Sequence, residues 1–337
     1  MAAPEPSPDL HDEGPAAPAR DLLAGLNPVQ EDAVVHAEGP LLVVAGAGSG
    51  KTRVLTHRIA HLIRDRGVSP FEILAITFTN KAADEMKSRV AALVGPVAQK
   101  MWVSTFHSAC VRILRRDGDK LGYPRAFTIY DQADANRLTG YVVRDLGLDT
   151  KRFPPRSVHA AISAAKNEGL DPITYAQKAG NLFERKIAEV FTEYQARLLR
   201  AGSMDFDDLL GQALRLLREH PDVLAHYQRR FRHILVDEYQ DTNRVQNELV
   251  LLLAADHRNV CVVGDQDQSI YAFRGADMRN IVEFEDAFPD TTVVLLEQNY
   301  RSTQTILDAA NAVIANNLSR KPKELWTDRG DGNPIVR

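Results

Sequence analysis

The stretch Ala45-Gly46-Ala47-Gly48-Ser49-Gly50-Lys51-Thr52 ends an apolar run and precedes a helical pattern. Glycines at this spacing let backbone N–H groups point at phosphate oxygens, while Lys51 reaches the β and γ phosphates and the Thr52 hydroxyl can hold Mg²⁺. Ala45 stands where the strict pattern has glycine. An ordinary glycine-rich turn is the alternative, but the flanking strand and helix are those that the motif requires. The stretch therefore predicts a site for ATP and Mg²⁺ at residues 46–52.

An aspartate and glutamate pair supplies the second half of such a site. Asp237 and Glu238 directly follow the apolar run His233–Val236, and a parallel strand would carry both carboxylates to the sheet edge where ligands bind. Asp237 would then bind Mg²⁺ through water, and Glu238 would be the general base for the attacking water. Alternatively, the two acids only cap the next helix.

Short apolar runs recur along the chain and predict the strands of one sheet. Their hydrophobicity is continuous rather than alternating, which is typical of parallel strands covered on both faces. The runs are Leu41–Ala45, Ile73–Thr79, Trp102–Thr105, His233–Val236, Val260–Val263 and Thr292–Leu296. Helical patterns lie between them, among them Lys51–Arg64, Lys81–Leu93 and Asn243–Ala254. This order predicts an α/β fold with a parallel sheet flanked by helices.

Residues 108–203 interrupt this alternation. They contain one plausible strand, Ala126–Tyr130, among amphipathic helical patterns, so we expect an inserted, mostly helical subdomain. The insertion carries 16 Lys and Arg against 11 Asp and Glu, whereas the whole chain has a net charge of −4. A basic insertion suggests a surface for an anionic polymer, although a solvated helical surface can carry the same excess.

Length and composition exclude several classes of protein. A chain of 337 residues, 26% charged and 44% hydrophobic, is typical of a globular protein of about two domains. No apolar stretch reaches the length of a membrane span, and the N-terminus has no signal-peptide pattern. Cys110 and Cys261 are isolated, so a disulfide framework is excluded. We expect a cytoplasmic protein without a membrane partner, and a disordered tail at residues 1–20.

Seven strings together resemble the superfamily 1 DNA helicases of the UvrD/PcrA/Rep type. They occur in the order of that family between about residues 26 and 305, and each would be weak support alone. The strings are AGAGSGKT, ILAITFTNKAADEM, TFHS, MDFDDLL, VDEYQDTNRVQ, VVGDQDQSIYAFRGAD and LLEQNYRST.

The resemblance implies further residues of the nucleotide site. Gln30 resembles the glutamine that reads adenine, and its amide can donate and accept toward a purine edge. Arg53 and Tyr300 resemble the stacking partners of adenine. Gln268 resembles a sensor of the γ phosphate, and Arg301 resembles an arginine finger.

The resemblance also implies a track for single-stranded DNA. Aromatic rings suit such a track because base stacking is worth about 1–3 kcal/mol per base and ignores sequence. Several family members carry tryptophan where Phe273 stands, so we expect a weaker grip there. The implied track residues are Phe78, Asn80, Thr105, His107, Phe206, Tyr271, Phe273 and Arg274.

The family implies a division into a RecA-like ATPase domain 1A at residues 21–107 and 204–297, the helical insertion 1B at 108–203, and the start of a second RecA-like domain 2A at 298–337. After a helical pattern at Gln304–Asn316, the sequence stops at Asn333–Arg337, which reads as the opening of a strand. We therefore expect an N-terminal portion of a longer helicase.

The activity that the resemblance implies is ATP-dependent DNA unwinding or single-strand translocation from 3′ to 5′. It would act on single strands and on junctions of single and double strands, in repair or replication, with ATP and Mg²⁺ as cofactors. The portion itself is expected to be weak or inactive as a motor. Two alternatives stay open: a module that binds nucleotide and DNA without motor activity, and an unrelated P-loop enzyme such as a kinase.

Overall fold

A computed structural model describes residues 21–271, 275–317 and 321–336. The predicted tail at residues 1–20 and two predicted track residues, Phe273 and Arg274, lie outside these ranges. Six strands form one parallel sheet in the order β3-β2-β6-β7-β1-β8. They are β1 (Leu41–Ala45), β2 (Ile73–Thr77), β3 (Trp102–Thr105), β6 (His233–Val236), β7 (Val260–Gly264) and β8 (Thr292–Leu296).

The predicted α/β class is confirmed, because each of the six apolar runs forms a strand of this sheet. Strand β2 ends at Thr77, two residues earlier than predicted. The reason is that Thr79 caps the following helix: its side chain accepts a hydrogen bond from the Ala82 backbone N–H at 3.1 Å. Local capping therefore ends the strand where hydrophobicity alone would have continued it.

Helices cover both faces of the sheet, and the strand residues alternate between the two cores. In β1, Leu41 and Val43 belong to one core and Leu42 and Val44 to the other, as the two-residue period of a strand requires. The first core is covered by α1 (Pro28–Val35), α2 (Lys51–Arg64) and α3 (Asn80–Val94). The second is covered by α4 (Phe106–Asp117), α9 (Phe206–Glu219), α10 (Pro221–Arg230), α11 (Arg244–Ala254) and α12 (Arg279–Ala287).

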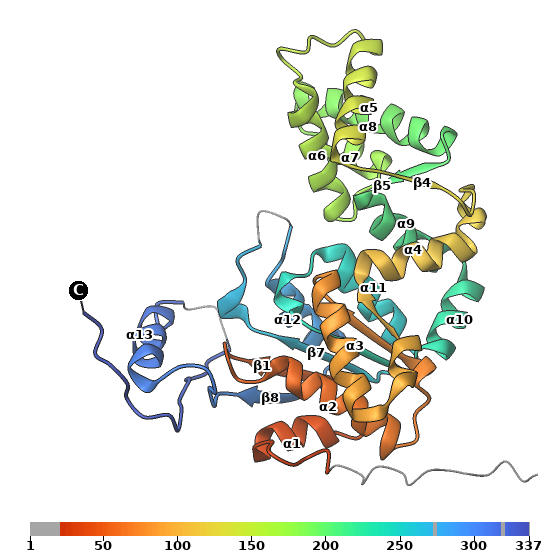
Figure 1. Cartoon of the computed structure of the whole chain (residues 1–337). Coiled ribbons are helices and arrows are strands. Elements are labelled where there is room, and N and C mark those ends of the chain that lie inside the picture. Colours follow the sequence, from red (N-terminus) through yellow and green to blue (C-terminus); the bar gives the residue numbers. More distant parts are fainter. Residues whose placement is uncertain (1–20, 272–274, 318–320, 337) are drawn as a thin grey trace, which may run out of the picture.

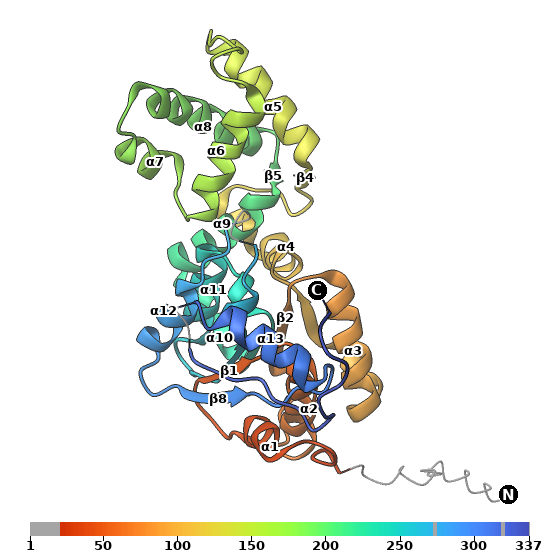
Figure 2. The same cartoon turned by 90° about the vertical axis from the view of Figure 1, so that its left-hand side faces the viewer.

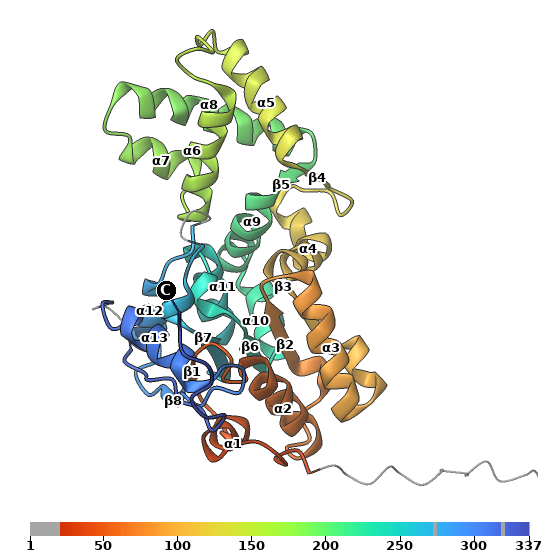
Figure 3. The ribbon, with the colours of Figure 1, turned by 60° about the vertical axis from the view of Figure 1, so that its left-hand side comes forward.

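Four helices form a projection with a hydrophobic core of its own, and Figures 1 and 3 show them standing apart from the sheet. These helices are α5 (Gln132–Asp145), α6 (Pro155–Asn167), α7 (Pro172–Lys178) and α8 (Leu182–Arg200). At their base, β4 (Thr128–Tyr130) pairs in parallel with β5 (Ser203–Asp205), a strand that the sequence analysis missed. Helix α4 packs instead in the core of the sheet through Cys110 and Ile113, although residues 108–117 fall inside the predicted insertion.

The last helix, α13 (Gln304–Ile314), lies outside the layers that cover the sheet (Figures 1 and 2). The following segment returns toward β8, where Gln298 and Trp326 form an isolated parallel bridge. The expected strand opening at residues 333–337 is wrong for residues 333–336, because none of them pairs with a strand and Val336 is 88% exposed. Within the described ranges, no helix combines the length and apolarity needed to cross a bilayer.

Candidate functional site

The candidate residues follow the carboxyl ends of the strands and therefore gather at one edge of the sheet. Apart from Gln30, which lies in α1, the predicted nucleotide residues follow β1, β6, β7 and β8, which are neighbours in the sheet. The predicted track residues after β2 and β3 lie at the other side of the same edge. The strand order thus places two groups of residues side by side.

The glycine-rich loop ends at the start of α2. Its last residue, Gly50, caps this 14-residue helix in the left-handed conformation, with φ 90°, and no side chain caps the helix. Gly48 is also left-handed, with φ 70°. Uncapped N–H groups and the positive end of the helix dipole make such an end suitable for phosphate. Lys51 and Thr52 stand in the first turn of α2.

Lys51 connects the loop with two other candidate residues. Its Nζ donates to Glu238 Oε2 at 2.6 Å and to Gln268 Oε1 at 3.5 Å. Gln240 Nε2 also donates to Glu238 Oε2, at 2.8 Å. The backbone of Glu238 is left-handed, with φ 51°, a conformation that costs a non-glycine residue energy and often marks functional sites. Side chains distant in sequence thus converge on one point at the sheet edge.

Asp237 is buried beside this cluster. Burial raises the pKa of its carboxyl to about 6, the neighbouring Glu238 adds to the effect, and Lys51 opposes it. Within the described residues no group of three or more His, Cys, Asp or Glu side chains could hold a metal ion. A single buried carboxylate beside Lys51 and Glu238 has the oxygen chemistry that Mg²⁺ takes, since Mg²⁺ keeps several waters and uses one or two protein oxygens together with substrate phosphates.

Backbone oxygens of the glycine-rich loop are held from behind by residues of two other segments. Gln30 Nε2 donates to the Ser49 carbonyl at 2.8 Å, and Asn299 Nδ2 donates to the Ala47 carbonyl at 2.5 Å. The Tyr300 backbone N–H donates to the Gly48 carbonyl at 2.9 Å. These contacts fix the loop through its carbonyl oxygens, and the Gly46 N–H also donates to the Leu296 carbonyl at 3.2 Å.

The structure places Gln30 differently from a freely presented adenine reader. It is 1% exposed, and its Oε1 accepts from the Asn27 backbone N–H at 3.2 Å as part of the capping box of α1. Tyr300 accepts from Asn27 Nδ2 at 2.9 Å. Arg53 and Arg301 are exposed, and Arg53 Nη2 donates to the Ala24 carbonyl at 3.4 Å. The adenine and finger roles of these residues stay predictions.

A groove of about 780 Å³ lies between the sheet edge and α6. Predicted track residues from three motifs take part in it: Phe78, Thr105 and His107 line the groove, and the ring of Tyr271 lies 5.0 Å from that of Phe78. Phe206 is 53% exposed, and its ring centroid lies 6.1 Å from that of His107. Exposed or half-buried rings beside a groove are suited to stacking with bases.

The track residue Asn80, which follows β2, lies beside Thr105 at the end of β3. Thr105 Oγ1 lies 3.5 Å from Asn80 Oδ1 and 3.0 Å from Ser108 Oγ, and it accepts from the Ser108 backbone N–H as the cap of α4. Burial lowers the pKa of His107, while Asp207 opposes the shift. A neutral imidazole can both donate and accept a hydrogen bond, so His107 can contact a base or a sugar from the wall of the groove.

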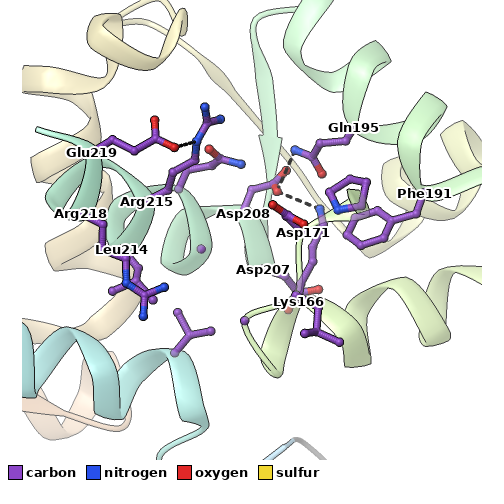
Figure 4. A pocket seen from close by; sticks show the side chains of 16 residues that line it. Lys166, Asp171, Phe191, Gln195, Asp207, Asp208, Leu214, Arg215, Arg218 and Glu219 are labelled. Carbon is purple, nitrogen blue, oxygen red and sulfur yellow. Dashed lines mark hydrogen bonds and ion pairs between the residues drawn. The ribbon is translucent and has the colours of Figure 1, made fainter. Parts of the chain in front are cut away.

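The sequence analysis missed a buried charged cluster around Lys166 of α6, and Figure 4 shows Lys166, Asp208 and Gln195 of this cluster. Lys166 Nζ lies 2.7 Å from Asp205 Oδ2 and 2.9 Å from Asp208 Oδ1, and all three side chains are almost fully buried. Tyr194 OH donates to Asp205 Oδ2 at 2.8 Å, and Gln195 Nε2 donates to Asp208 Oδ1 at 3.0 Å. This cluster joins α6 and α8 of the projection to the start of α9.

The cluster holds its lysine charged. Burial works against the charge of Lys166, but Asp205 and Asp208 keep its pKa above the usual value. Burial and then Asp205 raise the pKa of Asp208 to about 6. The ion pairs of a buried lysine depend on residues that are distant in the sequence. The only local signal for the cluster is the position of Lys166 in the polar string Lys166-Asn167-Glu168.

Asn167, next to Lys166, links the groove to the segment after β6. Asn243 Nδ2 donates to Asn167 Oδ1 at 2.5 Å, and Asn167 Nδ2 donates to Asp207 Oδ1 at 3.1 Å. Asn243 caps α11. The alternative that Asp237 and Glu238 cap this helix is therefore wrong. His159 of α6 also lines the groove. The sequence analysis named neither Asn167 nor His159.

Comparisons with known proteins show the family to which the chain belongs. The UvrD/REP helicase N-terminal domain family matches residues 26–289. The chain is 54% identical over 317 residues to the ATP-dependent DNA helicase PcrA of Bacillus subtilis (strain 168), covering 94% of the chain and 43% of that protein. It is 55% identical over 339 residues to the ATP-dependent DNA helicase UvrD1 of Mycobacterium tuberculosis (strain ATCC 25618 / H37Rv), covering 97% and 44%. The chain thus spans less than half the length of these relatives.

Proposed function

The chain belongs to the UvrD/REP helicase N-terminal domain family, and from this premise we propose that it binds ATP with Mg²⁺ at Lys51 and single-stranded DNA in the groove beside it. One observation carries the proposal. Lys51, Glu238 and Gln268 converge within 3.5 Å at the edge of a parallel sheet, and the same edge continues into a groove lined by Phe78, Thr105 and His107.

In the proposed reaction, Lys51 and the N–H groups at the start of α2 bind the phosphates. Glu238 accepts a proton from the attacking water, Gln268 contacts the γ phosphate, and Arg301 stabilises the developing charge. Thr52 and Asp237 would hold Mg²⁺, which neutralises phosphate charge when bound. The Lys51 to Glu238 ion pair supports this assignment, because it already places the base beside the phosphate-binding cation.

For the whole protein we propose an ATP-dependent helicase or single-strand translocase, moving from 3′ to 5′ and acting at junctions in repair or replication. The proposal is supported by the two relatives, which are both named ATP-dependent DNA helicases. The division into domain 1A, insertion 1B and the start of 2A, with its boundaries at residues 107, 203 and 297, belongs to the same proposal. A cytoplasmic location fits the two buried, unpaired cysteines.

The test is ATP hydrolysis by the whole protein with and without single-stranded DNA, for the wild type and Glu238→Gln. We expect stimulation by DNA in the wild type and a loss of about 10²- to 10⁴-fold in the variant, with nucleotide binding kept. Asp286→Asn, on the same protein but in α12, is the matched control and should keep the wild-type rate. Equal rates for the wild type and Glu238→Gln would reject Glu238 as the base.

A second candidate is a module that binds nucleotide and DNA without acting as a motor. The length of the chain relative to its helicase relatives favours this candidate for the 337 residues taken alone. Strand separation by this chain on a partial duplex would reject it. Hydrolysis that is indifferent to single-stranded DNA would instead favour an unrelated P-loop enzyme.

A further inference from the structure

The segment after α13 folds back onto the carboxyl end of β7 and brings two lysines there. Lys321 donates its backbone N–H to Gln266 Oε1 at 2.9 Å, and its Nζ pairs with Glu285 at 2.8 Å. Lys323 Nζ lies 2.5 Å from Asp265 Oδ1 and also pairs with Asp267. The side chains of Lys323 and Asp265 are 4% and 3% exposed. The Lys323 pair is therefore buried, whereas the Lys321 pair is partly exposed.

Asp265 is linked to two catalytic candidates, to Gln268 by one hydrogen bond and to Glu238 by two, through Gln240. Its Oδ2 accepts from Gln268 Nε2, and Gln268 Oε1 accepts from Lys51 Nζ at 3.5 Å. Its backbone N–H donates to Gln240 Oε1 at 2.8 Å, and Gln240 Nε2 donates to Glu238 Oε2 at 2.8 Å. A continuous series of contacts thus runs from Lys323 to the residues around the phosphates.

The direction of these bonds depends on the charge of Asp265. An ionised carboxylate only accepts hydrogen bonds, so Gln268 must present its NH₂ to Asp265 and its carbonyl oxygen to Lys51. Without Lys323, Asp265 keeps the Asp267 N–H and Gln268 Nε2 as neutral donors, and a buried carboxylate without a cation tends to move toward water. Loss of Lys323 would therefore free the amide of Gln268 to turn, although Lys323 itself does not reach Lys51.

We propose that Lys323 is a positioning residue: through Asp265 it orients Gln268, and so couples recognition of the γ phosphate to the segment that follows α13. This inference rests on the proposed function, since it needs ATP at Lys51. It adds a residue outside the seven motifs and assigns that segment a part in distinguishing ATP from ADP.

The test is the ratio of the Kd for ADP to that for ATP, measured with fluorescent mant nucleotides and Mg²⁺ on the full chain. In Lys323→Met we expect this ratio to fall at least about fivefold, the lower end of typical coupling between sites. Lys321→Met removes a neighbouring lysine that does not contact Asp265 and is the matched control. An unchanged ratio in Lys323→Met, or an equal fall in Lys321→Met, would overturn the proposal.

A double-mutant cycle with Gln268→Ala separates positioning from general damage. If Lys323 acts through Gln268, then Lys323→Met changes the ratio in the wild type but not in the Gln268→Ala background. Equal effects in both backgrounds would overturn the proposal. If Lys323→Met does not fold, Asp265→Asn is the second variant. It alters the same link without leaving an unpaired buried carboxylate, and it too must lower the ratio of the Kd for ADP to the Kd for ATP. Failure of the wild type to bind either nucleotide would instead reject the proposed function.

Discussion

Gly48 shows how tightly single residues of the phosphate-binding loop are constrained. It is left-handed, and a Cβ added there would lie 2.7 Å from Asn299 Nδ2 and 2.8 Å from the Cβ of Arg301. Gly67 has a similar φ of 66°, but a Cβ there would meet nothing within 4 Å. The two glycines therefore differ in surroundings and not in backbone conformation.

We predict that Gly48→Ala destabilises the protein more than Gly67→Ala. Both substitutions carry the cost of about 1 kcal/mol for a left-handed alanine, and only Gly48→Ala must also displace Asn299 from the Ala47 carbonyl. Urea unfolding of the two variants measures the difference. Equal losses of unfolding free energy would mean that the contacts behind the loop contribute nothing.

His233, at the opposite edge of the sheet, makes stability depend on pH. Burial lowers its pKa to about 4, and Arg58, His257, Arg232 and Arg66 add to the effect. The unfolded chain takes up this proton near the usual value of 6.5, and the folded protein only near 4, so stability is lost as the pH falls through that window.

For His233→Gln we predict a smaller loss of stability between pH 7 and pH 5. In the wild type, protonation of His233 accounts for about 1–2 kcal/mol of the loss in unfolding free energy between these pH values, after allowance for solvent screening. Urea unfolding at the two pH values gives the comparison. The prediction is refuted if the wild type and the variant lose the same free energy of unfolding.

Helix α6 is joined to both β5 and α9 by the side chain of Lys166. Replacing Lys166 by Met leaves Asp205 and Asp208 buried without a cation. We predict a loss of about 3–5 kcal/mol in the free energy of unfolding, measured by urea titration. Lys186→Met, which breaks the partly exposed pair with Glu189 on α8, should cost less than about 1 kcal/mol. Similar losses in both variants would contradict a structural role for the cluster.

The start of α9 also presents Phe206 to solvent beside the groove. We predict that Phe206→Ala weakens binding of a labelled oligo-dT by about 1–3 kcal/mol, as loss of one stacked base would. Fluorescence anisotropy measures the affinity. Phe71→Ala is the control, since Phe71 is 46% exposed but precedes β2 and so lies at the opposite edge of the sheet. If both variants bind like the wild type, Phe206 does not contact DNA.

Elements whose signal is local could be predicted from the sequence. The strands of the sheet follow from continuous apolar runs, and α2 matches its predicted range of Lys51–Arg64 without error. Strand β5 could not be predicted, because Ser203–Asp205 has no apolar run and exists only by pairing with β4. The strand forms through a contact between β4 and β5, which lie about 75 residues apart in the sequence.

For the whole molecule, sequence motifs identify the residues of the site but not how they support one another. The motifs brought Lys51, Glu238 and Gln268 together, and the structure places them within 3.5 Å. They gave no sign of the contacts that Lys166 and Lys323 make, because burial of a lysine depends on tertiary partners. Gln30 could be singled out, but its role in capping α1 and holding Ser49 required coordinates.

At the scale of the whole chain, the claim on which the rest depends is that ATP binds at Lys51. The direct measurement is the Kd of a fluorescent ATP analogue, with Mg²⁺, for the wild type, Lys51→Ala and the control Lys100→Ala, whose lysine precedes β3 at the opposite edge. We predict binding about 10- to 100-fold weaker in Lys51→Ala, as expected for loss of charge-assisted hydrogen bonds, and unchanged binding in Lys100→Ala. Equal affinity in all three proteins would contradict the account.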